Sequence, residues 1–373
     1  MAELQGFDDI VFFMFYGGTA MAALIACFYL LLRKGNAFVA DITPPLRLRR
    51  WAAAFFAVTI LAHIWWLFFY LYSSDIHSVF YVVLCGLDCM TMMTTVAGTL
   101  LAMLQDRKRH FWPFIIATLP YAVLLELHIV YPDSHFMTMV IAYIVLLYVL
   151  FIIYMVYAVK QYGRWLRDNY ADLEHKEVWQ SYMLIIVFSL FVIFYGFSDN
   201  ITICYIIRFI SLALIGLLLW RVETLQQLDN TTTEIAEEAP AEPKEVAPSA
   251  VSTDIGQLLE RHCEDAQLYL QHDLSLSQLS HAIGTNHYYL SQHFKQQDLT
   301  YNTYINGLRI RHFINLYHEA VANQQPFTAQ QLAHESGFRS YSTFSVAFKQ
   351  MMGQTVSAWM HDAAEGNLSE YTV

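Results

Sequence analysis

The chain has 373 residues, of which 56% are hydrophobic, 16% aromatic and only 14% charged, and its formal net charge is −11. Soluble globular proteins usually carry about 25% charged residues, so the composition excludes an ordinary soluble protein as a description of the whole chain. Charged residues are scarce in the long apolar runs before Arg221 and ordinary in number after it. This shift predicts an apolar, membrane-embedded part followed by a polar part.

Seven apolar segments are long enough to cross a bilayer, which takes roughly 20 mainly apolar residues. They cover residues 10–32, 51–71, 79–104, 111–129, 137–159, 179–197 and 201–220. We therefore interpret residues 1–221 as a seven-span, sensor-like transmembrane region. The last segment contains Arg208 and no lysine, which excludes a photoreceptor of the microbial rhodopsin kind, because retinal needs a Schiff-base lysine there.

Lysine and arginine are shared unevenly between the loops that connect these segments. The loops after the first, third and fifth segments contain twelve of them: Arg33, Lys34, Arg47, Arg49, Arg50, Arg107, Lys108, Arg109, Lys160, Arg164, Arg167 and Lys176. The N-terminal tail and the intervening loops contain none. Because cytoplasmic loops carry the excess of basic residues, we expect the N-terminus outside and the C-terminus in the cytoplasm.

Four ionisable residues, His63, Asp88, Glu126 and Arg208, interrupt the apolar segments. With the orientation above, all four would lie roughly 5–14 Å below the outer surface, at 1.5 Å per helical residue. Such residues are costly in a membrane and indicate a function. One hypothesis is a pocket for a small polar or anionic signal ligand, since the Arg208 guanidinium can bind carboxylate or phosphate. The alternative is a purely structural ion pair between Asp88 and Arg208, with Glu126 reaching towards the interface.

Residues 222–252 form a segment rich in alanine, proline and glutamate. This composition is typical of a disordered acidic linker. As a random coil, its central 25 or so residues would span about 25–30 Å, enough to let the following domain leave the membrane surface. Cleavage within this linker, which would release a soluble factor, remains an alternative to permanent tethering.

Short amphipathic helices are expected from residue 253 to residue 363. In the first pair, Leu276, Leu279 and Ala282 share one helical face, Gly284 marks a turn, and a second helix buries Leu290 and Phe294. Ser275 and Asn286 stand where helix N-caps are expected. This arrangement is a helix-turn-helix.

The same pattern returns later in the chain, around Gly337. Leucine and alanine precede the glycine, and an aromatic-rich helix ending in Phe348 and Lys349 follows it. A long helix, starting near Tyr301, joins the two units. The expected fold class is therefore all-α: a seven-helix transmembrane bundle, then a C-terminal all-α domain with two helix-turn-helix units joined by a long helix. Two such units could enter successive major grooves about 34 Å apart.

These residues resemble the AraC/XylS family of bacterial transcription regulators over about residues 254–362. The matching positions are Leu290, Ser291, Phe294, Lys295, Tyr304, Ile305, Asn306, Leu308, Arg309, Ile310, Ala333, Gly337, Phe338, Ser340, Phe344, Ser345, Phe348, Lys349, Gly353 and Thr355. The resemblance implies sequence-specific binding of promoter DNA and control of transcription initiation. Combined with the spans, it suggests a one-component sensor in a bacterial inner membrane, with its DNA-binding domain in the cytoplasm.

The two recognition helices supply the candidate DNA-binding residues. For base reading these are Asn286, His287, Tyr288, Ser291 and Gln292 on the first helix, and Arg339, Ser340, Tyr341, Ser342 and Thr343 on the second. Lys295 and Lys349 are suited to phosphate contacts. RNA polymerase and a second copy of the chain, in a homodimer, are further candidate partners, besides the lipid bilayer and a small signal ligand.

The domain departs from the family pattern in several places. Val356 stands where proline is usual, Phe313 where alanine is common, and Met360 where a basic residue is common; Gln292 and Val346 replace arginines often found on the recognition helices. Residues 254–362 carry six lysines and arginines against nine acidic residues, although DNA-binding domains normally have a basic footprint. Intrinsic DNA binding would then be weak and would depend on dimerisation, a locally basic face or histidine protonation. Alternatively, the domain is a protein-interaction module of a transmembrane receptor or transporter.

No motif predicts catalysis. The chain lacks a glycine-rich phosphate loop and a nucleophile elbow, and its five cysteines and its histidines have no metal-ligand spacing. We therefore expect no enzyme, no catalytic residues, no metal and no cofactor. Residues 364–373 are interpreted as a C-terminal tail.

Overall fold

A computed structural model of the chain describes residues 7–33, 36, 42–72, 79–132, 135–195, 201–228 and 255–365. The chain divides into two compact units, one with Met1–Tyr162 and His175–Leu228, the other with Gly163–Glu174 and Asp229–Val373. Within the described residues every named element is helical, and one isolated bridge pairs Tyr170 with Ser275. The all-α class is confirmed. Most of the predicted linker and of the C-terminal tail lies outside the described residues, and the predicted domain limits stay predictions.

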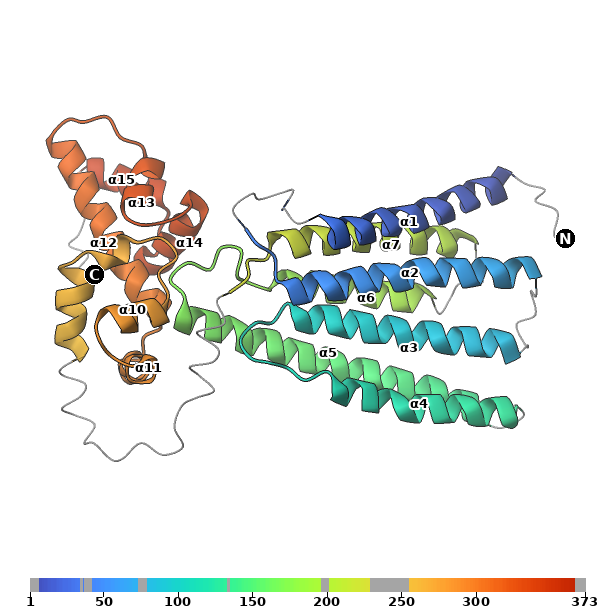
Figure 1. Cartoon of the computed structure of the whole chain (residues 1–373). Helices are drawn as coiled ribbons and strands as arrows, with labels where there is room; N and C mark the ends of the chain where they lie inside the picture. The colour runs from blue at the N-terminus through green and yellow to red at the C-terminus, as the bar shows by residue number, and fades with distance from the viewer. Residues whose placement is uncertain are drawn as a thin grey trace, which may run out of the picture. The chain divides into compact units, whose positions relative to one another are not determined.

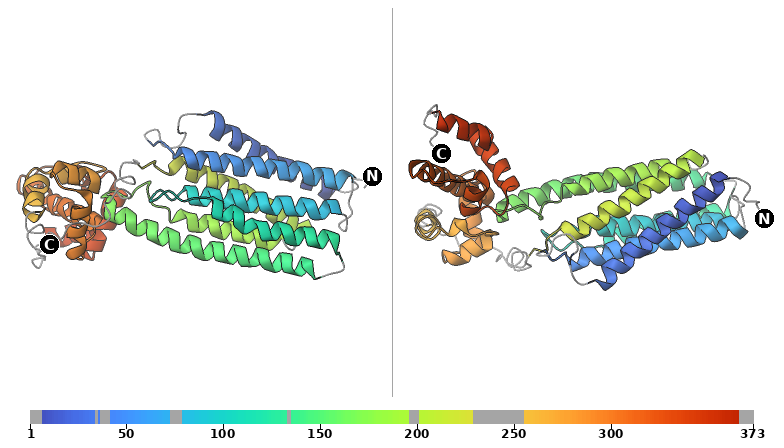
Figure 2. Two further views of the ribbon diagram at one scale, coloured as in Figure 1. Left: turned by 60° about the horizontal axis from the view of Figure 1, so that its bottom comes forward. Right: turned by 90° about the horizontal axis from the view of Figure 1, so that it is seen from above.

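Seven helices that lie side by side form the first unit (Figure 1). They are α1 (Phe7–Leu32), α2 (Leu46–Tyr72), α3 (Val79–Ala102), α4 (Trp112–Val130), α5 (Phe136–Asn169), α6 (Gln180–Tyr195) and α7 (Ile201–Thr224). Only the part of α5 up to Tyr162 belongs to this unit. Figure 2 shows the same bundle from two further sides.

Six of these helices, α1 to α5 and α7, are long and apolar enough to cross a membrane. The sixth predicted span, residues 179–197, lies partly outside the described residues, and α6 is the described helix within it. Large apolar side chains such as Ile115, Leu150 and Phe209 point outwards and are more than half exposed. An apolar outer surface with backbone hydrogen bonds kept inside each helix suits contact with lipid.

Small residues bring α1, α2 and α3 close together. Ala23 and Ala26 on α1 and Ala52 on α2 are almost completely buried, and the Cys27 thiol reaches the Ala53 carbonyl oxygen at 3.5 Å. On α3, a Cβ added at Gly98 would overlap the Trp51 ring. Helices in lipid associate through this kind of close packing, because burial of apolar groups gives little driving force there.

The loops after α1, α3 and α5 contact residues 226–228, which follow α7. The Gln227 amide donates to the Thr43 carbonyl at 2.9 Å and the Gln226 amide to the His175 carbonyl at 2.8 Å. The Leu228 amide donates to the Gln105 side chain at 3.0 Å. The loops that carry the basic residues therefore lie at one end of the bundle, as the orientation rule for cytoplasmic loops requires.

The second unit contains the two predicted helix-turn-helix units and the long helix between them (Figure 1). Its helices are a π-turn (Glu260–Glu264), a 3₁₀ turn (Leu268–Leu270), α10 (Leu276–Ala282), α11 (His287–Gln296), α12 (Tyr301–Ala322), α13 (Ala329–Glu335), α14 (Tyr341–Met352) and α15 (Val356–Ala364).

Helix α12 joins two separate hydrophobic clusters. Its first half packs with Leu279, Leu290 and Phe294, and its second half packs with Phe344 and Phe348. Apart from Ala171, all buried members of both clusters come from residues 255–359. Because these residues supply nearly the whole core, fragment 254–373 has what it needs to fold by itself.

Candidate functional site

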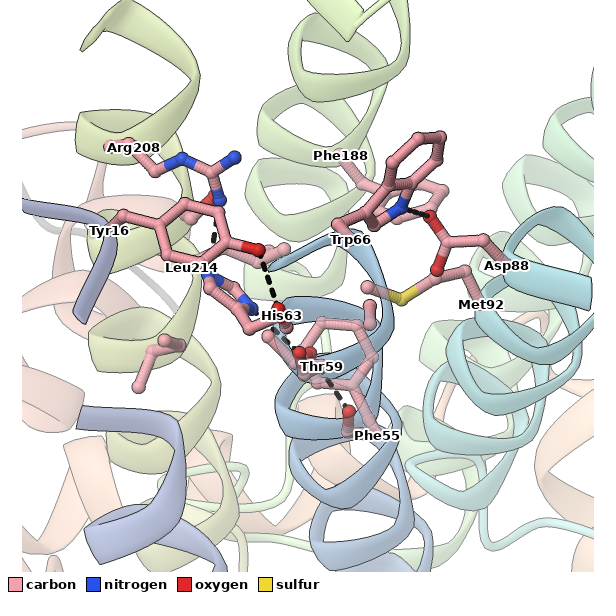
Figure 3. Close-up of a pocket in the computed structure, with 13 residues that line it drawn as sticks. Tyr16, Phe55, Thr59, His63, Trp66, Asp88, Met92, Phe188, Arg208 and Leu214 are labelled. Carbon is pink, nitrogen blue, oxygen red and sulfur yellow. Dashed lines mark hydrogen bonds between the residues drawn. The ribbon is translucent and has the colours of Figure 1, made fainter. Parts of the chain in front are cut away.

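A cavity of about 60 Å³ lies among the helices of the first unit, room for a few water-sized groups. Side chains from five helices line it: Tyr16, Phe55, Thr59, Ala62, His63, Trp66, Asp88, Met92, Phe188, Arg208, Ser211, Leu214 and Ile215. Figure 3 shows Arg208, Tyr16 and His63 together on one side and Trp66 with Asp88 on the other. The structure thus brings together three of the four ionisable residues selected from the sequence.

His63 connects α1, α2 and α7 at this cavity. Its Nδ1 lies 2.7 Å from the Thr59 carbonyl oxygen, which can only accept a hydrogen bond, so Nδ1 carries the proton and Nε2 has the lone pair. The guanidinium of Arg208 lies 3.1 Å from that Nε2 and donates to it. The Tyr16 hydroxyl donates to the His63 carbonyl at 2.7 Å. Neutral His63 therefore orients Arg208.

Arg208 is the cationic group of the cavity. Its guanidinium carbon lies 4.7 Å from the centre of the Tyr16 ring, a stabilising cation–π distance. The Asp88 carboxylate accepts from the Trp66 indole N–H at 3.1 Å. Glu126, the fourth residue selected from the sequence, does not line the cavity; it is exposed on α4.

Polar caps start the helices of the first helix-turn-helix. The Ser275 hydroxyl accepts from the Gln278 amide at 3.2 Å and the Gln278 side chain accepts from the Ser275 amide at 2.8 Å, a complete capping box. Asn286 caps α11 by accepting from the Tyr288 amide at 2.9 Å. Both caps predicted from the sequence are confirmed. Gly284 lies between them with a φ of +73°.

The second helix-turn-helix has the same construction. Thr328 caps α13 and Ser340 caps α14, each accepting from the amide three residues later. The turn residue Gly337 has a φ of +92°. A Cβ there would lie 2.8 Å from the Leu270 Cα, so the glycine permits a close approach of two backbones as well as the turn.

The predicted DNA-binding residues lie on α11 and α14 or immediately before them. Exposed among them are Asn286, Tyr288, Gln292, Lys295, Tyr341, Ser342 and Lys349; partly buried are His287, Ser291, Arg339, Ser340 and Thr343. The apolar partners Leu290, Phe294, Phe344 and Phe348 are all buried. Each helix therefore presents a polar outer face on an apolar base, the form of a recognition helix.

Residues 279–362 match the family model described as "Helix-turn-helix domain", which is of the AraC type. The C-terminal region is an AraC-type helix-turn-helix domain. The apolar N-terminal helices match no family. No curated protein and no solved structure matches the chain.

Several predicted contact residues of the AraC-type domain already have partners. Arg339 forms an ion pair with Asp273 at 3.0 Å. The Thr343 hydroxyl donates to a carboxylate oxygen of Glu174 at 3.2 Å, and the His287 Nε2 lies 2.9 Å from the Asn169 side-chain oxygen. Burial lowers the pKa of His287, and the nearby charge of Lys295 lowers it further. Among the described residues, no group of three or more potential ligands could hold a metal ion.

Arg309 has a structural position that the sequence did not reveal. It is one of the six lysines and arginines in residues 254–362, and it is only 1% exposed. Its guanidinium donates to the carbonyls of Tyr269 and Gln271 at 2.8 Å each and lies over the ring of Phe338 at 5.6 Å. Arg309 thus fastens the long helix to the segment before the first helix-turn-helix and is not available to phosphate. The one sign of this burial in the sequence is that Arg309 stands among the apolar residues of the long helix.

Proposed function

We propose that this chain is a membrane-bound, sequence-specific transcription regulator of the AraC type, which couples a signal sensed in or outside the membrane to promoter binding. The observation that carries the proposal is the pair of capped recognition helices, α11 and α14, in a chain that also has six candidate membrane spans. The proposed location is a bacterial inner membrane, with the AraC-type domain in the cytoplasm.

The polar faces of the recognition helices support DNA reading. Asn286 and Gln292 carry amides that can pair with adenine, and Tyr288 presents an exposed aromatic ring. Lys295 and Lys349 are exposed at corresponding places near the ends of α11 and α14. Lysines at these places would bind phosphates and set the register of the helices on DNA.

The cavity in the first unit supports sensing. Arg208 faces it with a guanidinium, and most of the other lining residues are apolar. A small ligand with an anionic group fits this chemistry, since an arginine in an apolar site binds carboxylate strongly. A volume of about 60 Å³ limits such a ligand to a few non-hydrogen atoms in the conformation described.

The test uses the full-length protein in lipid nanodiscs and sheared genomic DNA from the source organism. At low salt we expect the protein to retain a few promoter fragments. Gln292→Ala should change the enriched sequence, because it removes a base contact. Lys349→Ala should weaken retention of all fragments about equally and reduce the salt dependence, because it removes a phosphate contact. Retention without sequence preference would contradict the proposal.

A second function, a protein-interaction module of a receptor or transporter, is favoured by the charge of the domain. Residues 254–362 carry nine acidic residues against six basic ones, and Arg309 is buried. Val346 is 59% exposed where the resemblance leads one to expect arginine. Failure of the full-length protein to retain any DNA, even after forced dimerisation, would favour this function.

A further inference from the structure

A short segment outside residues 255–365 packs into the AraC-type domain. Residues Gly163–Glu174, the last turns of α5 and the chain after it, belong to the same compact unit as the domain. Ala171 is 1% exposed and belongs to the hydrophobic cluster around Leu290. The Ala171 amide donates to the Leu274 carbonyl at 3.3 Å. The Asn302 side chain donates to the carbonyl of Ala171 at 2.6 Å. The segment is therefore a built-in part of the unit.

This segment contacts both recognition helices. In the last turn of α5, the Asn169 side-chain oxygen accepts from His287, the first residue of α11, over 2.9 Å. At the end of the segment, the Glu174 carboxylate accepts from the Thr343 hydroxyl, in the first turn of α14, over 3.2 Å. The N-terminal turns of recognition helices are the parts that reach base edges in the major groove. One stretch of chain thus contacts the first turn of both recognition helices.

The segment is acidic, and so resembles in charge the DNA that it would exclude. Residues 168–174 contain Asp168, Asp172 and Glu174 and no lysine or arginine. Asp168 interacts electrostatically with Lys295, which is one of the two expected phosphate contacts. Asp172 interacts in the same way with Arg309. The Asp168 carboxylate near Lys295 therefore competes with the DNA phosphate that this lysine would bind.

We propose that residues 168–174 form an inhibitory segment that occupies the DNA-reading surface, so that the AraC-type domain binds DNA only when this segment leaves. The inference rests on the proposed function, because it presupposes DNA binding. The segment begins within the last turn of α5, whose earlier part is apolar. A signal in the membrane that shifts α5 would therefore act on the segment without passing through the long linker.

The experiment compares variants of the full-length protein in lipid nanodiscs, with a random-sequence duplex of about 30 base pairs as the probe. Asn169→Ala and Glu174→Ala each remove one contact to a recognition helix, and the double variant removes both. Glu319→Gln is the matched control, since it removes one exposed acidic charge from α12 and leaves the segment unchanged. Each variant is measured by fluorescence anisotropy at two salt concentrations.

We expect the double variant to bind the duplex at least about fivefold more tightly than the wild type, because two hydrogen bonds that oppose binding are lost. Each single variant should give a smaller gain, and Glu319→Gln should match the wild type. Equal affinity of the wild type and the double variant would overturn the inference and leave the proposed function standing. Absence of binding by every variant would overturn both.

Hydrogen exchange distinguishes an inhibitory segment from a merely structural one, because only an inhibitory segment should exchange faster when DNA binds. In the free protein the Ala171 amide is hydrogen-bonded and buried, so it should exchange slowly. Saturating the wild type with the same duplex should speed exchange across residues 168–174, because DNA and the segment compete for one surface. Protection that persists with DNA bound would overturn the inference.

Discussion

The arginines of this chain show how differently one residue type can be used. Arg309 is buried, and its guanidinium bonds two backbone carbonyls. Arg208 lines a cavity between apolar helices, and Arg339 is paired with Asp273. The sequence showed three cations, and it suggested a pocket only for Arg208, because an arginine in an apolar span is costly. The partners of Arg309 and Arg339 lie about 40 and 66 positions away in the sequence. No local sequence pattern reveals such contacts.

Arg208 should decide ligand binding at the cavity. In a thermal-shift screen of small carboxylates with the full-length protein, a ligand at ten times its Kd should stabilise the wild type by about 1.4 kcal/mol. Arg208→Lys should abolish that shift, because it loses the planar pair of donors. Glu126→Gln is the control, since Glu126 is exposed and does not line the cavity. A shift that survives Arg208→Lys would mean that the ligand binds elsewhere.

His293 should make the AraC-type domain less stable in acid. The ring is 5% exposed, its Nε2 accepts from the Gln297 amide group at 3.1 Å, and burial lowers its pKa below the ordinary 6.5. Below that value the unfolded chain takes up a proton that the folded chain resists. The stability contribution is therefore complete above pH 6.5 and is lost as the pH falls towards the lowered pKa.

Urea unfolding of fragment 254–373 at several pH values between about 7.5 and 5 measures this effect. His293→Gln should flatten the decrease in the free energy of unfolding, because an uncharged amide replaces the titrating ring. Part of the decrease should remain, since burial also lowers the pKa of His312. An unchanged pH dependence in the variant would contradict the assignment to His293.

At the scale of single elements, helix starts and turns followed from local sequence. Ser275 and Asn286 were expected to cap their helices and do so, because a cap involves residues only two or three positions apart. Gly284 and Gly337 were expected at turns and have positive φ. What the sequence did not show is that Gly337 also lies against the backbone of Leu270, a contact between segments 67 positions apart.

The two turn glycines should therefore differ in their tolerance of alanine. Gly284→Ala meets no atom within 4 Å and should cost about 1 kcal/mol, the strain of a left-handed residue with a side chain. Gly337→Ala adds a clash with the Leu270 backbone and should cost about 3 kcal/mol or more. Urea unfolding of fragment 254–373 compares them directly. Equal losses of stability would show that the Leu270 contact relaxes without cost.

At the scale of the whole chain, the loops with basic residues gather at one end of the bundle. The chain after α7 bonds to the loops that follow α1, α3 and α5. The charge distribution in the sequence already indicated a common side for these loops, since cytoplasmic loops collect lysine and arginine. Among the described residues, six helices meet the length and hydropathy of a span.

Reporter fusions should confirm this orientation. An enzyme that is active only outside the cytoplasm should be active when fused after residue 132 and inactive when fused after residue 108 or residue 373. Replacing Arg47, Arg49 and Arg50 by glutamine should weaken the difference, because these residues supply much of the positive charge of the first loop. Activity of the fusion at residue 373 would place the AraC-type domain on the wrong side for promoter DNA.

By itself, the sequence determined the all-α class, the apolar segments, the helix-turn-helix repeat and its caps. These features depend on composition, on periodicity and on neighbours within one or two turns of helix. Tertiary structure alone decided that His63, Asp88 and Arg208 share a cavity without Glu126, that Arg309 is buried, and that residues 163–174 pack on the recognition helices. Each of these facts joins residues tens of positions apart, and their contact is set by how helices pack and not by any pattern along the chain.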